Sequence, residues 1–298
     1  MITAWWHSET AAQGDGWPNM VRMGGNAVPF GKVSLPMYNL PEMQSDNRAF
    51  WGAMRVELSR LGLDDLPDDL DFTRRPAPAK IETDTLFTQV CGYPLQTIYR
   101  RQAALLAAPV YGDAHCKGAT HCGIFIVGAN SRFKRLEDLR GSRFAFNSRH
   151  SNSGMNLPRR AIAEIAGGKP FFGSIAETHS HPGNIERVAR NEIDATCVDN
   201  VTYAFVVRHR PVLADATRVL ATTPPSPTIP FVTTSQATDD LKQALREALF
   251  RVARAEEWAD VRAGLLLQDI VPIGDASRYE ELLRYETEAR ALGYPQLQ

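Results

Sequence analysis

Short apolar runs alternate with amphipathic stretches along most of this chain, and that alternation restricts its fold more than any other feature. Runs such as Asp84–Cys91, Cys122–Val127 and Ile193–Val198 read as strands, and stretches with apolar residues at helical spacing separate them. Strands that alternate with helices pack into mostly parallel α/β sheets. We therefore expect an α/β protein with mixed, mostly parallel sheets.

Two places let the chain cross between two lobes. One is the predicted strand at 122–127, and the other is the Pro-rich break at Pro224–Pro227. A 298-residue chain is long enough for two lobes of ordinary size. The expected division is a lead-in segment at 1–30, a first lobe at 31–121 plus 223–298, and a second lobe at 122–222. The C-terminal helices are expected to pack back on the first lobe.

A strand, a polar turn and a helix follow one another at residues 143–156. Phe144–Phe146 is apolar, Ser151–Ser153 is small and polar, and Gly154 opens a helix that runs to about Ala166. Free backbone N–H groups and the helix dipole both favour an anion at such a helix start. The alternative is an ordinary serine N-cap with no ligand.

Other polar or aromatic side chains also stand just after predicted strands. They are Tyr38, Tyr93 and Asp199, with His181 in a further loop. Ligands of open α/β sheets bind beyond the carboxyl ends of the strands, so this shared position favours a binding site. Each residue also has a structural alternative: a half-buried ring for the tyrosines, a helix N-cap for Asp199 and a turn residue for His181.

The chemistry of these residues predicts the charge of the ligand. Donors at a helix start, with a protonatable His181, suit a phosphonate, phosphate or carboxylate group. Asp199 and the tyrosine faces suit a cationic or polar tail. We therefore expect a small anionic or zwitterionic ligand.

Four segments of the sequence resemble a known family. They read SLPMYNLPE, TQVCGYPL, LEDLRGSRFAFNSRHSNSGMN and ETHSHPGNIERVARNEIDATCVD. In this order they resemble the phosphate/phosphonate-type periplasmic substrate-binding proteins of ABC transporters, over about residues 31–235. The resemblance implies the type II periplasmic-binding-protein fold, in which two α/β lobes close over a ligand like a hinge.

The resemblance also implies which residues bind the ligand. The family's Ser-Thr-Ser-Gly helix start corresponds here to Ser151, Asn152, Ser153 and Gly154, so an amide replaces the middle hydroxyl. The other matching positions are Tyr38, Tyr93, His181 and Asp199. By this resemblance the chain is a monomer that captures a solute for an ABC transporter permease, without a cofactor.

A cytosolic enzyme or ligand sensor on the same bilobal fold is the alternative function. Asp199, Glu177 and His181 could act as acid and base groups. The sequence contains no G-x-S-x-G or P-loop motif, and Gly123–Gly128 does not match a dinucleotide fingerprint. We therefore predict no catalytic residue.

Histidines and cysteines near residue 120 raise the question of a metal or a disulfide. His115, Cys116, His121 and Cys122 cluster, but without paired CxxC or HxxxH spacing, so we predict no metal site. We do predict a bridge between Cys91 and Cys116, which requires that the two meet and would favour an oxidising compartment.

Charge and targeting signals narrow the partners and the location. The formal net charge is -1 and no long basic run occurs, which argues against nucleic acid or an anionic membrane as main partner. Residues 1–30 show no apolar run after a basic start, so we predict no signal peptide there. The family resemblance implies the periplasm, and the cytoplasm is the alternative.

Overall fold

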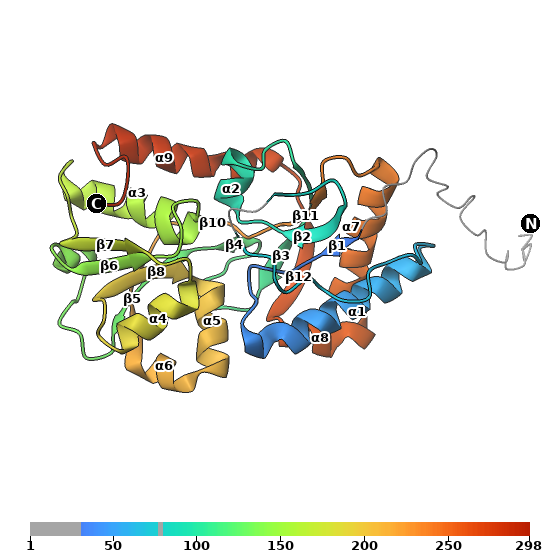
Figure 1. The fold of residues 1–298 in the computed structure, drawn as a ribbon, viewed down its shortest axis with the longest axis horizontal. Coiled ribbons are helices and arrows are strands. Elements are labelled where there is room, and N and C mark those ends of the chain that lie inside the picture. The colour runs from blue at the N-terminus through green and yellow to red at the C-terminus, as the bar shows by residue number, and fades with distance from the viewer. Residues whose placement is uncertain (1–30, 77–79) are drawn as a thin grey trace, which may run out of the picture.

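The computed structural model describes residues 31–76 and 80–298, and the expectations for residues 1–30 lie outside this part. Two five-stranded sheets lie next to each other along the long axis of the molecule (Figure 1). The first has the order β1-β2-β11-β3-β12 and the second β7-β6-β8-β5-β9. We call each sheet, with the helices packed on it, the first and the second lobe.

The elements have the following bounds. The first sheet contains β1 (Lys32–Val33), β2 (Thr85–Gln89), β3 (Ala103–Tyr111), β11 (Phe231–Thr234) and β12 (Leu267–Pro272). The second contains β5 (Gly123–Gly128), β6 (Arg143–Phe146), β7 (Ser174–Glu177), β8 (Ala195–Asp199) and β9 (Thr217–Thr222). The α-helices are α1 (Gln44–Arg60), α2 (Gly92–Thr97), α3 (Leu157–Ala166), α4 (His181–Ala189), α5 (Asn200–His209), α6 (Pro211–Ala216), α7 (Asp239–Arg254), α8 (Ala259–Gly264) and α9 (Glu281–Ala291). The shorter helical turns are η1 (Pro41–Met43), η2 (Leu136–Leu139), η3 (Asn152–Asn156), η4 (Glu256–Trp258) and η5 (Ala276–Tyr279).

The two-lobed α/β fold with mixed sheets is confirmed, but antiparallel neighbours outnumber parallel ones. The β1–β2, β6–β7 and β6–β8 pairs are parallel, and the other six pairings in the described part of the chain are antiparallel. The reason is the crossing between the sheets. Strands β5 and β11 lead away from the crossing, whereas the strands paired with them lead toward it. These pairs are therefore antiparallel.

Two short strands form the crossing. Strand β4 (Thr120–His121) pairs antiparallel with β10 (Ser226–Pro227), and both segments join one sheet to the other (Figure 1). Strands β6 and β8 run toward this crossing and end at Phe146 and Asp199. The loops that follow them therefore face the first lobe.

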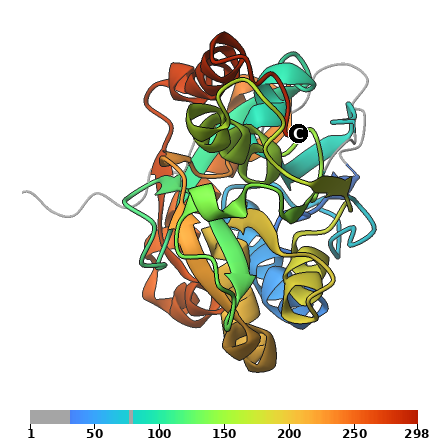
Figure 2. The ribbon, with the colours of Figure 1, turned by 90° about the vertical axis from the view of Figure 1, so that its left-hand side faces the viewer.

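The position of the C-terminal helix differs from the expectation that all C-terminal helices pack on the first lobe. Helices α7 and α8 pack on β12 and α1, as expected, whereas α9 packs along α3 of the second lobe (Figures 1 and 2). The chain end joins the same lobe, because the backbone N–H groups of Phe171 and Phe172 donate to the carbonyl of Gln298 at 2.7 and 3.1 Å.

A buried polar network explains why α9 lies there. Asn156 is fully buried, and its amide donates to the carbonyl of Leu282 on α9 at 3.0 Å and to Oδ1 of Asn152 at 3.1 Å. Arg159, also buried, donates to Asn156 Oδ1 at 2.6 Å and to the carbonyl of Pro295 at 3.1 Å. Buried polar groups need partners, and the C-terminal segment supplies them.

Replacing Asn156 with alanine should reduce the free energy of unfolding by about 2–4 kcal/mol, because the buried partners of its amide lose their hydrogen bonds. Urea denaturation followed by circular dichroism measures this loss. The matched control is Thr287→Ala on α9, whose hydroxyl only donates to the carbonyl of Leu283 within the helix. Equal losses in the two variants would contradict the role given to the network.

Candidate functional site

Two loops of the second lobe lie against each other at the crossing. The backbone N–H of Thr178 donates to the carbonyl of Phe146 at 2.9 Å, and that of His179 donates to the carbonyl of Asn147 at 2.7 Å. Helix α4 then begins at His181, with Ser180 as its N-cap. This pairing places His181 beside the polar turn that follows β6.

The start of the helix at residues 151–154 is closely packed against that histidine. Ser151 Oγ accepts the backbone N–H of Gly154 at 3.0 Å, and Ser153 Oγ lies 3.4 Å from His181 Nε2. A Cβ at position 154 would lie 2.0 Å from Asn147 Oδ1 and 3.0 Å from His181 Cε1, so any side chain there would have to displace the Asn147 amide. The structure thus brings together four of the predicted residues: Ser151, Ser153, Gly154 and His181.

The first turn of this helix is wider than the predicted α-helix. Asn156 N–H donates to the carbonyl of Ser151, five residues back, at 3.1 Å, and residues 152–156 form a π-turn. Pro158 follows at the start of α3. Proline has no N–H to donate and its ring crowds the preceding turn, which favours the wider geometry.

Asp199 is a buried carboxylate at the end of β8. It is the N-cap of α5 and accepts the backbone N–H of Thr202 at 2.8 Å and the Thr202 hydroxyl at 2.5 Å. No ion pair to this carboxylate occurs in the described part of the chain. Its hydrogen bonds in the described structure therefore come from neutral donors.

Tyr38 of the first lobe faces this carboxylate. Its ring packs edge-on against Tyr111, at 5.5 Å between ring centroids, and at a tilt of 53° against Phe205, at 5.6 Å. Burial raises the pKa of Tyr38 well above its usual value, and the Asp199 charge raises it further. Among the described residues, its hydroxyl makes no hydrogen bond of normal geometry.

Two histidines near Asp199 are held in the neutral form. Burial lowers the pKa of His121 on β4 and of His181, and the Asp199 charge opposes the shift without cancelling it. Within residues 31–76 and 80–298, the Nδ1 atom of each ring has no hydrogen-bond partner.

A pocket of about 460 Å³ lies between the two lobes next to these groups. Its first-lobe wall comprises residues 36–41 and 72–76, and its second-lobe wall includes Asn147, residues 179–183, Glu186, Thr202, Phe205 and Arg210. Of the predicted site residues, Tyr38 and His181 line it directly. Ser153 stands behind His181, and Asp199 caps the helix that carries Thr202.

Five polar atoms in the pocket lining are buried without a partner in the described structure. They are Tyr38 Oη, Asn39 Oδ1, Arg74 Nε, Asn147 Oδ1 and His181 Nδ1. Because buried polar atoms are normally hydrogen-bonded, a set of five around one pocket indicates a ligand site. Burial also lowers the pKa of the Arg74 guanidinium.

Sequence reasoning missed three of the polar groups in this region. Arg74 lies in a stretch that composition marks as a surface connection, and nothing local shows that it turns inward. His121 was considered only as a possible metal ligand. Asn147 stands directly after a predicted strand, which was a usable signal.

Two predicted site residues are engaged elsewhere. Tyr93 Oη donates to Glu286 on α9 at 2.5 Å. The Asn152 side chain donates to Ser226 Oγ on β10 at 3.0 Å and accepts from Asn156, so it fastens the helix start to the crossing. Neither side chain lines the interlobe pocket.

An ion cluster at the pocket rim joins the two lobes. Arg210 donates to both carboxylate oxygens of Glu42 on η1, at 2.8 and 3.2 Å, and to Glu186 on α4 at 2.7 Å. Its hydrogen bonds to Glu42 lower the pKa of that carboxyl group. The cluster therefore fixes how closely the lobes approach on this side.

The predicted Cys91–Cys116 disulfide is wrong. All four cysteines of the chain are free thiols. Cys91 accepts the N–H of Asn152 at 3.4 Å and Cys116 accepts the Asn200 amide at 3.1 Å, so each sulfur has its own partner. Burial raises the pKa of both thiols to about 11.

Neither a metal cluster nor a membrane span is found among the described residues. No group of three or more His, Cys, Asp or Glu side chains there could hold a metal ion. Likewise, no helix in that part of the chain has the length and apolar character to cross a membrane.

Comparison with protein families and comparison with solved structures both give matches. Residues 89–278 match the family model described as "ABC transporter, phosphonate, periplasmic substrate-binding protein". A search of curated proteins finds no match.

Three solved structures illustrate the likeness in fold. The binding-protein component of an ABC phosphonate transporter from Pseudomonas aeruginosa has a TM-score of 0.71 at 17% identity, covering 89% of this chain and 87% of that one. PhnD1 from Prochlorococcus marinus, in complex with methylphosphonate, gives 0.65 at 15% identity, with 87% and 98% covered. XAC2383 from Xanthomonas citri, bound to a chloride ion, gives 0.64 at 16% identity, with 88% and 98% covered.

The neutral buried histidines predict how stability depends on pH. A histidine whose pKa is lowered in the fold favours folding above its ordinary pKa of 6.5, and this stability is lost as the pH falls, because the unfolded chain takes up the proton. Stability should therefore fall below about pH 6.5, by up to ~1.4 kcal/mol per pH unit for each histidine. Substituting His121→Asn should make the urea-denaturation free energy fall less steeply with pH. Parallel curves for wild type and variant would contradict the burial effect.

Proposed function

This chain belongs to the periplasmic substrate-binding proteins of phosphonate ABC transporters, and on that premise we propose that its two lobes close around one small anionic or zwitterionic ligand. One observation carries the proposal. Both lobes present buried, unpartnered polar atoms to a single pocket, Tyr38 and Arg74 from the first and Asn147 and His181 from the second. A ligand held between the lobes would satisfy all of them at once.

The side chains favour a negative group on the ligand. Arg74 is a half-buried guanidinium in the pocket wall, and such a group gains most from a charge-assisted hydrogen bond to an anion. Ser153 and His181 add a hydroxyl and an imidazole at the helix start, where the dipole has the same sign. Phosphonate, phosphate and related anions match these donors.

A positive group on the ligand would be attracted toward the Asp199 carboxyl group, which Tyr38 faces. The Asp199 carboxylate is buried without an ion pair among the described residues, and the aromatic rings of Tyr38 and Tyr111 lie beside it. A cationic tail would neutralise this buried charge and pack on the aromatic faces. A zwitterion therefore fits the site as well as a simple anion.

We propose the setting of this protein on the same premise. The family delivers its ligands to ABC transporter permeases from the periplasm, so we place this chain there, as a monomer that docks on such a permease. We assign residues 31–121 plus 223–280 to the first lobe and 122–222 to the second, with α9 packed along α3 of the second lobe and also in contact with α2 of the first. The complex of the Prochlorococcus neighbour with methylphosphonate supports phosphonate as a first ligand to test.

A thermal-shift screen tests the proposal directly. Phosphate, phosphite, methylphosphonate, an aminoalkyl phosphonate and small carboxylates should be compared at one concentration. At least one should raise the melting temperature, because a ligand that binds only the folded chain stabilises it. If none does, and the chain instead converts a metabolite, the binding function is wrong.

Ser153→Ala should weaken binding of the best ligand by about 1–3 kcal/mol, because it removes the hydroxyl that lies 3.4 Å from Nε2 of the pocket-lining His181. Isothermal titration calorimetry measures this change. Ser174→Ala on the exposed part of β7 is the control and should leave the affinity unchanged. Unchanged affinity in Ser153→Ala would mean that the polar turn only caps a helix and does not contribute to ligand binding.

Arg74→Gln tests the first lobe in the same way. The affinity for an anion should drop by about tenfold or more, because this half-buried guanidinium, unlike Arg210, forms no ion pair among the described residues. Lys80→Gln removes an equal charge from an exposed neighbouring position and serves as the control. If both variants bind alike, only the overall charge of the surface matters.

A further inference from the structure

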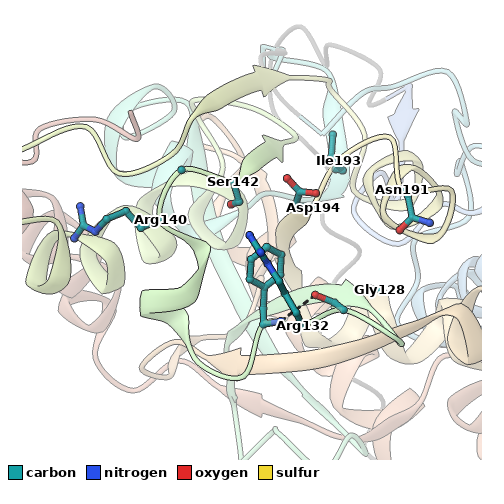
Figure 3. A pocket seen from close by; sticks show the side chains of 10 residues that line it. Gly128, Arg132, Arg140, Ser142, Asn191, Ile193 and Asp194 are labelled. Carbon is teal, nitrogen blue, oxygen red and sulfur yellow. Dashed lines mark hydrogen bonds between the residues drawn. The ribbon is translucent and has the colours of Figure 1, made fainter.

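A second pocket lies at the far end of the second lobe. It has a volume of about 370 Å³ and is formed where β5 ends, β6 begins and the chain approaches β8 (Figure 3). The interlobe pocket adjoins the opposite ends of β6 and β8. The five residue steps from Asp194 to Asp199 separate the two by roughly 16 Å at the rise of a β-strand.

Two arginines hold the walls of this pocket in place. Arg218 donates to the backbone carbonyls of Ala129 at 3.3 Å and Ser131 at 3.1 Å, and also to that of Phe133.

On the opposite wall, Arg143 donates to the carbonyls of Asn191 at 2.9 Å and Glu192 at 3.0 Å and pairs with Asp194 at 2.8 Å. Side chains thus fix both loops before any ligand arrives, which reduces the entropy cost of binding.

Ser142 supplies an unsatisfied hydroxyl in the lining. The residue is 6% exposed, and its Oγ has no hydrogen-bond partner in the described part of the chain. The side chain points toward Arg132 and the pocket (Figure 3). A buried hydroxyl without a partner is uncommon and is explained if a ligand atom accepts its hydrogen.

Arg132 supplies an uncompensated positive charge. Its guanidinium lies over the Phe133 ring at 5.7 Å, and it forms no ion pair within the described residues. It extends toward Ser142 and Asp194, whereas Arg140 turns away to stack on Phe171 at 4.6 Å (Figure 3).

The other charges of the pocket do not cancel the positive charge of Arg132. Hydrogen bonds from Arg143 lower the pKa of Asp194, and the charge of Arg132 contributes a smaller part of the same shift. Because Asp194 is already paired with Arg143, and Arg218 adds a further positive charge behind the wall, the pocket is positive overall.

We propose that this pocket is a second binding site, for a small free anion with a carboxylate or phosphoryl group, in which Arg132 pairs with the anion and Ser142 donates to it. The volume admits a phosphate or a small di- or tricarboxylate. This site is independent of the interlobe pocket and of the solute carried there.

Hydrogen–deuterium exchange of the full chain, with and without inorganic phosphate or citrate, locates such binding. Either anion should slow exchange in peptides covering residues 129–143 and 190–194. Arg132→Gln should abolish this protection, and Ser142→Ala should raise the anion concentration needed for it by about tenfold. Lys134→Gln is the matched control: it removes the same charge from the same loop at an exposed position that does not line the pocket, and protection should persist.

Two results would overturn the proposal. One is unchanged exchange in both segments with phosphate and with citrate up to about 10 mM, where a site with a Kd near ~1 mM would be filled. The other is equal loss of protection in Lys134→Gln and Arg132→Gln, which would show that the anion responds only to surface charge. Peptides covering 147–154 and 178–183 report on the interlobe pocket in the same experiment, so failure at one site is distinguished from failure at the other.

Discussion

The double crossing between the two sheets is the constraint on which the rest of the structure depends. Gly123 and Thr223 exchange hydrogen bonds there: Gly123 N–H donates to the Thr223 hydroxyl at 2.9 Å and Thr223 N–H donates to the Gly123 carbonyl at 2.8 Å. Cys122 and Asn200 are joined in the same way, at 2.9 and 3.1 Å. These contacts fix the end of β8 against the start of β5. As a result, the loops that follow the strands running toward the crossing, such as β6 and β8, face the opposite lobe.

Burying polar side chains at this crossing reduces the stability of the fold, and the way in which these side chains are arranged indicates a function. The Asp199 carboxyl group accepts two hydrogen bonds from Thr202 and forms no ion pair among the described residues, while burial lowers the pKa of the nearby histidines and raises that of Tyr38. A chain selected for stability alone would fill this region with apolar side chains, since unpaired polar atoms reduce stability. The unpartnered atoms around the interlobe pocket are therefore best understood as groups reserved for a ligand.

Local pattern was enough to predict much of the fold and part of the candidate site. The strand at β6, the polar turn and helix α3 follow one another as the sequence predicts, because apolar runs, serine caps and glycine positions act over a few residues. The convergence of Ser153 with His181 also follows from the rule that ligand sites form where strands end. Strand β12 (Leu267–Pro272), in contrast, is missed, because its six residues show no regular apolar–polar alternation and follow shortly after a helical stretch.

The remaining errors come from partners that are distant in the sequence. Glu286 on α9 draws Tyr93 away from the pocket, and Ser226 on β10 takes up the Asn152 amide. Arg74 turns inward from a stretch whose composition is that of a surface loop. Single-sequence patterns do not encode such long-range choices, which the tertiary fold decides.

The most direct test of the account is a crystal structure of the chain with methylphosphonate or with the best ligand of the screen. The account predicts one anion in the interlobe pocket, with donors from both lobes within hydrogen-bonding distance, Arg74 from the first and Ser153 or His181 from the second. An empty interlobe pocket in crystals grown at saturating ligand, or an anion contacting one lobe only, would contradict it.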